Sequence, residues 1–65
     1  MHILLNGQTT QTAAATLGAL LDEQQFDRND IACALNGDFV PQGRYDITIL
    51  SEECRIEVLS PMQGG

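Results

Sequence analysis

The last two residues of this 65-residue chain, Gly64 and Gly65, carry its most distinctive chemistry. A carboxylate at the end of two residues without side chains can enter a narrow channel, and its carbonyl carbon is unhindered toward attack. With 6 glycines in 65 residues, a chance Gly-Gly end has a probability of roughly 1%. The end therefore predicts an acyl group that is presented to another protein. The alternative is a frayed tail or an expression scar, although Ser60-Pro61-Met62-Gln63 does not resemble a linker.

Residues 60–65 form a predicted flexible, extended tail, and residues 1–59 form the domain that precedes it. Six extended residues span up to roughly 20 Å, which is enough to reach into the active site of another protein. Pro61 restricts the free tail and so lowers the entropy lost when the tail is ordered. Gly65 is the predicted site of acyl chemistry, and the residues predicted to thread into the partner are Gly64, Gln63 and Met62.

No internal catalytic set is recognisable in the sequence. It contains neither a glycine-rich phosphate loop nor a Ser/His/Asp combination. Cys33 and Cys54 are too far apart for a CxxC motif, and His2 is the only histidine, so neither a metal site nor a redox motif is predicted. Glu52-Glu53 is typical of a solvated turn. We expect a protein that is not an enzyme and that binds no cofactor of its own.

The composition indicates an acidic protein that acts on other proteins. The net charge is -6, with nine carboxylates against three arginines and no lysine. Such a surface repels nucleic acid and anionic membranes, and it suits a partner with a basic docking face. The absence of lysine is either a small-sample effect or a protection against self-acylation. Neither a membrane-spanning apolar run nor a signal peptide is visible, so we expect a cytoplasmic protein.

Two Asn-Gly pairs predict two β-hairpins, because both positions of the pair tolerate positive φ. Asn6-Gly7 would join residues 3–5 to a polar return strand at residues 8–11, which we expect at a sheet edge. Asn36-Gly37 would join residues 31–35 to residues 39–40.

The segment between the hairpins predicts one helix. Its apolar stripe, at spacing i, i+3 and i+4, consists of Leu17, Leu20 and Leu21. Thr12 or Thr16 would be the N-cap, and the helix should end near residues 26–27. Gly18 costs such a helix about 1 kcal/mol relative to alanine, so we expect it to permit close approach to a sheet.

The remaining apolar segments alternate with period 2, as strands do. Ile31, Cys33 and Leu35 would face the core, as would Ile56 and Val58 in the last strand. Residues 46–50 are either a short strand or an irregular segment. Cys54 is expected at a turn.

The elements together predict an α+β domain in which one sheet packs on one helix. The outer face of this sheet would carry an exposed apolar patch for partner binding. The residues predicted for this surface are Leu4, Phe39, Leu59 and Pro61.

Over its whole length the chain resembles the ubiquitin-like β-grasp sulfur carriers. Among them it resembles the thiamine-biosynthesis sulfur carrier (ThiS) family. The resemblance is carried by the order of residues 3–7, 16–21, 34–41 and 55–65 and by the shared Gly-Gly end. It implies a mixed four- to five-stranded sheet packed on one α-helix. Where the family usually has a Gly-Asp turn before the last strand, this chain has Glu53-Cys54.

The resemblance also implies a mechanism. A ThiF-like adenylating enzyme would use ATP to adenylate the Gly65 carboxylate. Sulfur from a cysteine desulfurase or another donor would then displace AMP and leave a thiocarboxylate. A ThiG-like thiazole synthase would take this sulfur into the thiazole ring. The alternatives are a sulfur carrier for molybdopterin or tRNA thiolation, a ubiquitin-like protein modifier, and a plain binding module.

Overall fold

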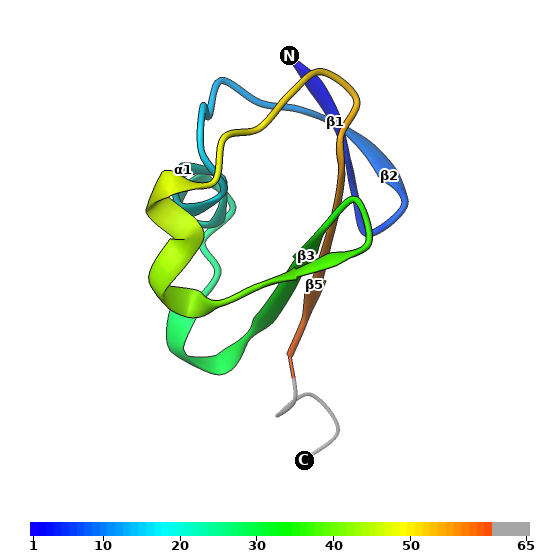
Figure 1. The fold of residues 1–65 in the computed structure, drawn as a ribbon. Helices are drawn as coiled ribbons and strands as arrows, with labels where there is room; N and C mark the ends of the chain where they lie inside the picture. The colour runs from blue at the N-terminus through cyan, green and yellow to red at the C-terminus, as the bar shows by residue number, and fades with distance from the viewer. Residues whose placement is uncertain (61–65) are drawn as a thin grey trace.

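Five strands form one mixed sheet in the computed structural model of the chain, which describes residues 1–60 (Figure 1). In chain order they are β1 (His2–Leu5), β2 (Gln8–Gln11), β3 (Ala32–Leu35), β4 (Asp38–Val40) and β5 (Arg55–Leu59). Their order across the sheet is β2-β1-β5-β3-β4, so the last strand lies at the centre. β5 runs parallel to β1 and antiparallel to β3. The predicted α+β architecture is confirmed.

Both predicted hairpins are present, and each is closed by an Asn-Gly turn. The φ angles are 51° and 82° at Asn6 and Gly7, and 51° and 89° at Asn36 and Gly37. Two successive positive φ angles are typical of a type I′ turn, whose twist matches that of the flanking strands. The return strands β2 and β4 therefore form the two edges of the sheet, as predicted for residues 8–11.

The only α-helix among residues 1–60 is α1 (Leu17–Glu23), which covers one face of the sheet (Figure 1). Thr16 is its N-cap, because the Thr16 hydroxyl accepts a hydrogen bond from the Ala19 N–H at 3.1 Å. Thr12 is buried instead, and its hydroxyl donates to Glu23 Oε1 at 2.6 Å. The structure thus assigns separate roles to the two threonines that the sequence left open.

The predicted end of the helix near residues 26–27 is wrong. The helix ends at Glu23, and Gln25 adopts a left-handed φ of 64°. The Phe26 N–H then closes the end by donating to the Leu21 carbonyl at 2.9 Å. A left-handed residue that follows the last turn is a common way to end a helix, but it is usually glycine or asparagine.

Gly18 faces η2 (Gln42–Ile47), not the sheet that the sequence predicted. A Cβ added at Gly18 would collide with Asp46 Oδ1 and lie 2.8 Å from Arg28 Nη2. Arg28 Nη2 lies 2.9 Å from Asp46 Oδ1 and 3.1 Å from Asp22 Oδ2. Its hydrogen bonds hold the pKa of Asp46 below the ordinary value. Gly18 therefore makes room for an ion-pair cluster that docks η2 on the helix.

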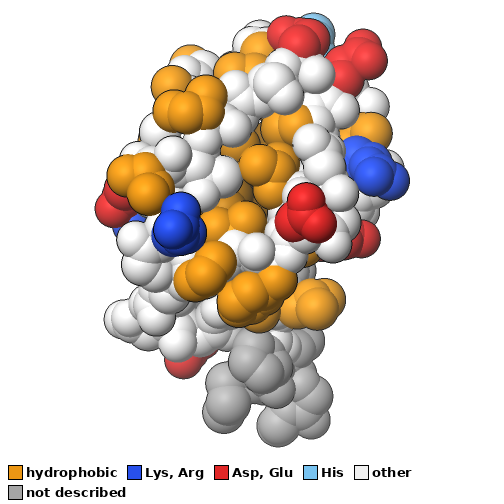
Figure 2. Space-filling model, in the orientation of Figure 1, with side chains coloured by type: hydrophobic (Ala, Val, Ile, Leu, Met, Phe, Trp, Pro, Cys, Tyr) orange, Lys and Arg blue, Asp and Glu red, His pale blue; other side chains and the backbone are white. Residues whose placement is uncertain are grey.

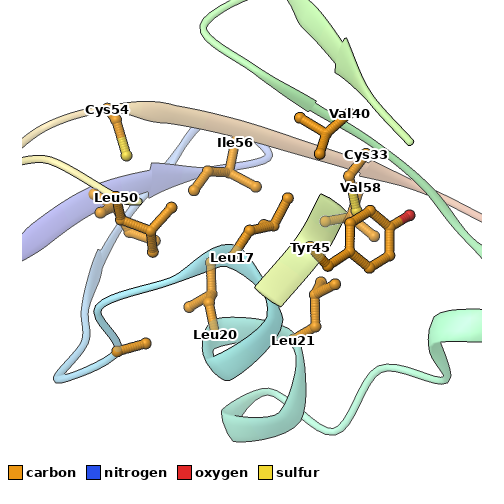
Figure 3. Packing of buried hydrophobic residues seen from close by; sticks show 12 residues of the cluster. Leu17, Leu20, Leu21, Cys33, Val40, Tyr45, Leu50, Cys54, Ile56 and Val58 are labelled. Carbon is orange, nitrogen blue, oxygen red and sulfur yellow. The ribbon is translucent and has the colours of Figure 1, made fainter. Parts of the chain in front are cut away.

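The core lies between α1 and the sheet (Figure 3). The helix stripe is fully buried, and Tyr45 of η2 fills the space beside Cys33. The predicted faces of β5 are confirmed, since its buried side chains are Ile56 and Val58. Ile31 lies just before β3, and it packs half-buried at the core margin, as does Leu35.

Residues 46–50 do not form a strand of the sheet: residues 46–47 end η2, and residues 48–50 are irregular. η2 ends at Ile47, and Ile49 makes a single antiparallel bridge with Thr16. Leu50 is buried, whereas Ile47 and Ile49 are exposed. Among residues 1–60 no helix has the length and apolar character needed to cross a membrane.

Candidate functional site

The predicted acyl end lies outside the described residues. This applies to Gly65 and Gly64, to the threading residues Gln63 and Met62, and to Pro61. The structure describes the strand from which these residues continue, and the surface around that strand.

The strand that leads to the C-terminus is held from both sides. Next to β1, the Leu4 N–H donates to the Cys54 carbonyl at 2.9 Å, and the register pairs Leu5 with Ile56. Next to β3, the antiparallel register extends to the pair of Ala32 and Leu59, at the end of β5. The central position of β5 therefore gives the tail a fixed point of departure.

The turn asparagines add side-chain bonds to this strand. Asn6 Oδ1 accepts a hydrogen bond from the Val58 N–H at 2.8 Å, and Asn36 Oδ1 accepts one from the Arg55 N–H at 2.8 Å. Sequence reasoning gave Asn6 and Asn36 only a turn role. The Asn-Gly pair itself carries no signal of a contact across 52 residues.

The outer face of the sheet, away from α1, carries an apolar hollow. Its walls are Phe39 and Leu59, which are 70% and 69% exposed. Ala34 stands opposite Phe39 in the β3–β4 register, and Ala32 stands opposite Leu59 in the β3–β5 register. These small residues leave a depression of about 400 Å³ between the larger side chains. We call this region the docking face, and the residues that line it are Asn6, Ala32, Cys33, Ala34, Phe39, Glu57 and Leu59.

The predicted apolar patch is brought together only in part. Phe39 and Leu59 line the same hollow, but Leu4 is half-buried and lines a different one, with His2 and Thr9. Leu4 pairs with Arg55 at the start of β5, while Leu59 lies at its end. At about 3.3 Å per residue, this places the two leucines roughly 13 Å apart along the strand.

Ile47 and Ile49 form a second exposed apolar pair, with exposed fractions of 66% and 69%. The sequence did not identify them as surface residues, because their spacing is also that of a strand with one buried face. Figure 2 shows that hydrophobic side chains reach the surface at several places on the face in view, among scattered acidic and basic ones.

Charge on the docking face comes from Glu57, which stands opposite Ala34 in the β3–β5 register. Within residues 1–60, the ion pairs of arginine are those of Arg28 with Asp22 and Asp46. Glu57 is exposed and has no ion-pair partner in this part of the chain. A partner that covers the hollow must therefore accommodate a carboxylate beside apolar side chains.

Two buried titratable groups of the described residues, Cys33 and Tyr45, have a raised pKa. Burial raises the pKa of the Cys33 thiol. Burial also raises the pKa of Tyr45, and together with the hydrogen bond to Cys33 it brings this pKa to about 12. Both groups are therefore neutral near pH 7. His2 Nδ1 lies 3.9 Å from Glu52 Oε2, and both side chains are exposed. Across residues 1–60, no group of three His, Cys, Asp or Glu side chains is arranged to hold a metal ion.

Solved structures of one bacterial protein share this fold. A crystal structure of the thiamine biosynthesis protein ThiS from Geobacter metallireducens matches with a TM-score of 0.83 and 23% identity, and the match covers 100% of both chains. An NMR structure of a thiamine biosynthesis protein from the same organism matches with a TM-score of 0.79 and 23% identity, over 100% of this chain and 88% of that one. The likeness establishes the ubiquitin-like β-grasp fold.

No curated protein matches the sequence. The family model, in contrast, matches nearly the whole chain, including the end that the structure does not describe. Because the ThiS family model matches residues 3–65, the chain belongs to the ThiS family.

Proposed function

We propose that this chain is a sulfur carrier in thiamine biosynthesis and that Gly65 carries the sulfur as a thiocarboxylate. The observation that carries the proposal is the Gly64–Gly65 end of a ThiS-family chain, a few residues downstream of the central strand. The two similar structures, described as thiamine biosynthesis proteins, support the choice of pathway.

The proposed chemistry takes place in the active sites of partners in the cytoplasm. An oxygen of the Gly65 carboxylate attacks the α-phosphorus of ATP on a ThiF-like adenylating enzyme, and pyrophosphate leaves. Persulfide sulfur, supplied by a cysteine desulfurase or another donor, attacks the resulting acyl-adenylate and displaces AMP. A second thiol attacks the donor's sulfur in the acyl disulfide and forms a disulfide with the donor, and the thiocarboxylate leaves. A ThiG-like thiazole synthase then takes the sulfur from the thiocarboxylate. The chain contributes the acyl group, while its partners contribute the catalytic groups.

The folded body would provide recognition. Ordering an extended tail costs about 1–2 kcal/mol per residue, so binding of the tail needs support from a docked surface. Phe39 and Leu59 on the docking face, continued by Pro61, are the proposed contacts, and Leu4 would contribute from the start of β5. The net charge of -6 favours a partner with a basic surface.

Intact mass spectrometry tests the proposal. The chain is incubated with the ThiF-like enzyme of the same genome, Mg-ATP and a persulfide donor. We expect a mass gain equal to the replacement of one oxygen by sulfur, located at Gly65 by fragmentation. A chain that lacks Gly65 is the control and should stay unchanged. An amide-linked adduct as the only product would contradict the sulfur-carrier role and favour a protein modifier.

A further inference from the structure

The two Asn-Gly turns hold opposite ends of the same strand. Asn6 and Asn36 share a φ of 51°, and each offers its side-chain oxygen to an N–H of β5 at 2.8 Å. Asn36 bonds Arg55, where β5 begins, and also donates its own N–H to the Arg55 carbonyl at 2.7 Å. Asn6 bonds Val58, close to the end of β5. The chain thus contains a natural pair of matched contacts that differ in their distance from the C-terminus.

Asn6 continues the hydrogen bonding of β1 to β5 beyond the end of β1. β1 stops at Leu5, the residue that pairs with Ile56 of the parallel strand. The Asn6 N–H donates to the Ile56 carbonyl at 2.8 Å, and its side-chain oxygen then accepts from the Val58 N–H. One residue therefore extends the β1 side of the ladder to Val58. Three residues, Leu59, Ser60 and Pro61, separate Val58 from the predicted threading segment, which begins at Met62.

We propose that Asn6 is a positioning residue for the C-terminal acyl group, which it serves by fixing the end of β5 from which the tail departs. This inference rests on the proposed function. Without the Asn6 oxygen, the end of β5 would be held mainly by its antiparallel pairing with β3, which closes at Leu59 and Ala32. The position of the end of β5, at Val58 and Leu59, would then vary.

A variable departure point lowers the fraction of molecules that present the tail correctly to a docked partner. The apparent affinity falls by the same fraction, whereas the chemical step on a correctly threaded tail is unchanged. We therefore expect the KM for the carrier to rise and kcat to stay constant. One net hydrogen bond changes the ratio of held to released strand ends by a factor of about five, so the KM rises by at most that factor.

Three variants test this role. Asn6→Gly and Asn36→Gly each remove the side-chain acceptor and keep a residue that tolerates positive φ, so both should fold. Asn6→Asp restores an acceptor oxygen at the same place. The readouts are hydrogen exchange of single amides in the free chain and ATP–pyrophosphate exchange with the ThiF-like enzyme, at a temperature where all variants are fully folded.

In the free chain, Asn6→Gly should speed exchange of the Val58 amide about fivefold or more, and Asn36→Gly should do so for the Arg55 amide. With the enzyme, Asn6→Gly should raise the KM for the carrier by more than twofold and by at most about fivefold, at unchanged kcat. Asn36→Gly should stay within twofold of the unaltered chain, and so should Asn6→Asp. A residue that only supported global stability would not change KM under these conditions. If Asn6, which also lines the docking face, acted by direct contact with the partner, then Asn6→Asp, which changes the charge there and keeps the acceptor for Val58, would raise KM as well.

Two outcomes overturn the inference alone. One is an unchanged exchange rate of the Val58 amide in Asn6→Gly. The other is an equal KM for the Asn6→Gly and Asn36→Gly variants while the unaltered chain is a good substrate. A complete lack of adenylation of the unaltered chain would contradict the proposed function and, with it, the positioning role.

Discussion

The Glu53 N–H donates to the His2 carbonyl at 2.6 Å and ties the turn before β5 to the first residue of β1. Glu53 makes this bond from a left-handed backbone with φ 61°. For a residue with a Cβ this region costs roughly 1–2 kcal/mol relative to ordinary backbone. Glu53 stands where the resemblance to the ThiS family led us to expect glycine. The chain therefore keeps the turn geometry without the residue that suits it best.

Glu53→Gly should stabilise the protein by about 1 kcal/mol, because glycine adopts this φ without strain. Urea unfolding followed by circular dichroism measures the change in the free energy of unfolding. The matched control is Glu52→Gly. This substitution removes Glu52 Oε2, which accepts a hydrogen bond from the backbone N–H of His2 at 2.8 Å. The free energy of unfolding of this control should fall by about 1 kcal/mol. If both variants are destabilised to the same extent, the backbone at Glu53 is not strained.

The parts of the fold that could be predicted from the sequence rest on local chemistry. Asn6-Gly7 and Asn36-Gly37 tolerate positive φ whatever surrounds them, so the hairpins were predictable. The alternation of Ile56 and Val58 with exposed neighbours placed the inner face of β5 in the same way. A period of 2 identifies the buried face of a strand without knowledge of its partners.

The errors have a tertiary origin. Gly18 faces Asp46 and Arg28, which come from segments that no helical pattern brings together. The helix ends early because Gln25 is left-handed, and glutamine gives no such signal. Leu4 was grouped with Leu59 because both face outward, but the parallel pairing of β1 with the start of β5 separates them. This pairing joins opposite ends of the chain, and local sequence does not encode it.

Alkaline pH should destabilise the protein through Tyr45. Its pKa is raised from 10.0 to about 12 in the folded state, chiefly by burial. The unfolded state releases this proton first, so the stabilising effect is complete below pH 10 and is lost between pH 10 and about 12. Tyr45 is the only tyrosine, so the ultraviolet absorbance of phenolate monitors this residue alone.

Tyr45→Phe is the control for this titration. It keeps the ring in the core and removes the ionisable group, so its free energy of unfolding should fall less over the same pH range. The pKa of Cys33 also depends on the Tyr45 hydroxyl, so the absorbance of phenolate, together with the difference in stability, assigns the effect to Tyr45. A tyrosine absorbance that titrates near pH 10 in the folded protein would contradict the proposed effect of burial.

Glu57→Lys should slow association with the ThiF-like enzyme. The acidic surface is expected to steer the chain toward a basic partner, and Glu57 stands on the docking face. We expect the association rate to fall about fivefold at low ionic strength, and the difference to shrink as salt screens the charges. Stopped-flow binding at several salt concentrations measures the association rate and its dependence on salt. Asp30→Lys makes the same change in net charge outside the docking face, and it should lower the association rate less. Equal association rates for the two variants would show that net charge alone steers the chain.

Leu59→Thr should weaken the complex with the ThiF-like enzyme while leaving the free protein stable. Leu59 is 69% exposed, so little apolar burial is lost in the free chain, and threonine suits a strand. At a docked interface the same truncation removes a central apolar contact, and we expect Kd to rise about tenfold. Ile49→Thr is a close control, because Ile49 is also 69% exposed but lies by α1, outside the docking face. Calorimetric titration of both variants compares the two surfaces directly. A loss of affinity confined to Ile49→Thr would move the proposed interface from the sheet to the helix side, whereas a loss confined to Leu59→Thr would support recognition next to the strand that carries the acyl end.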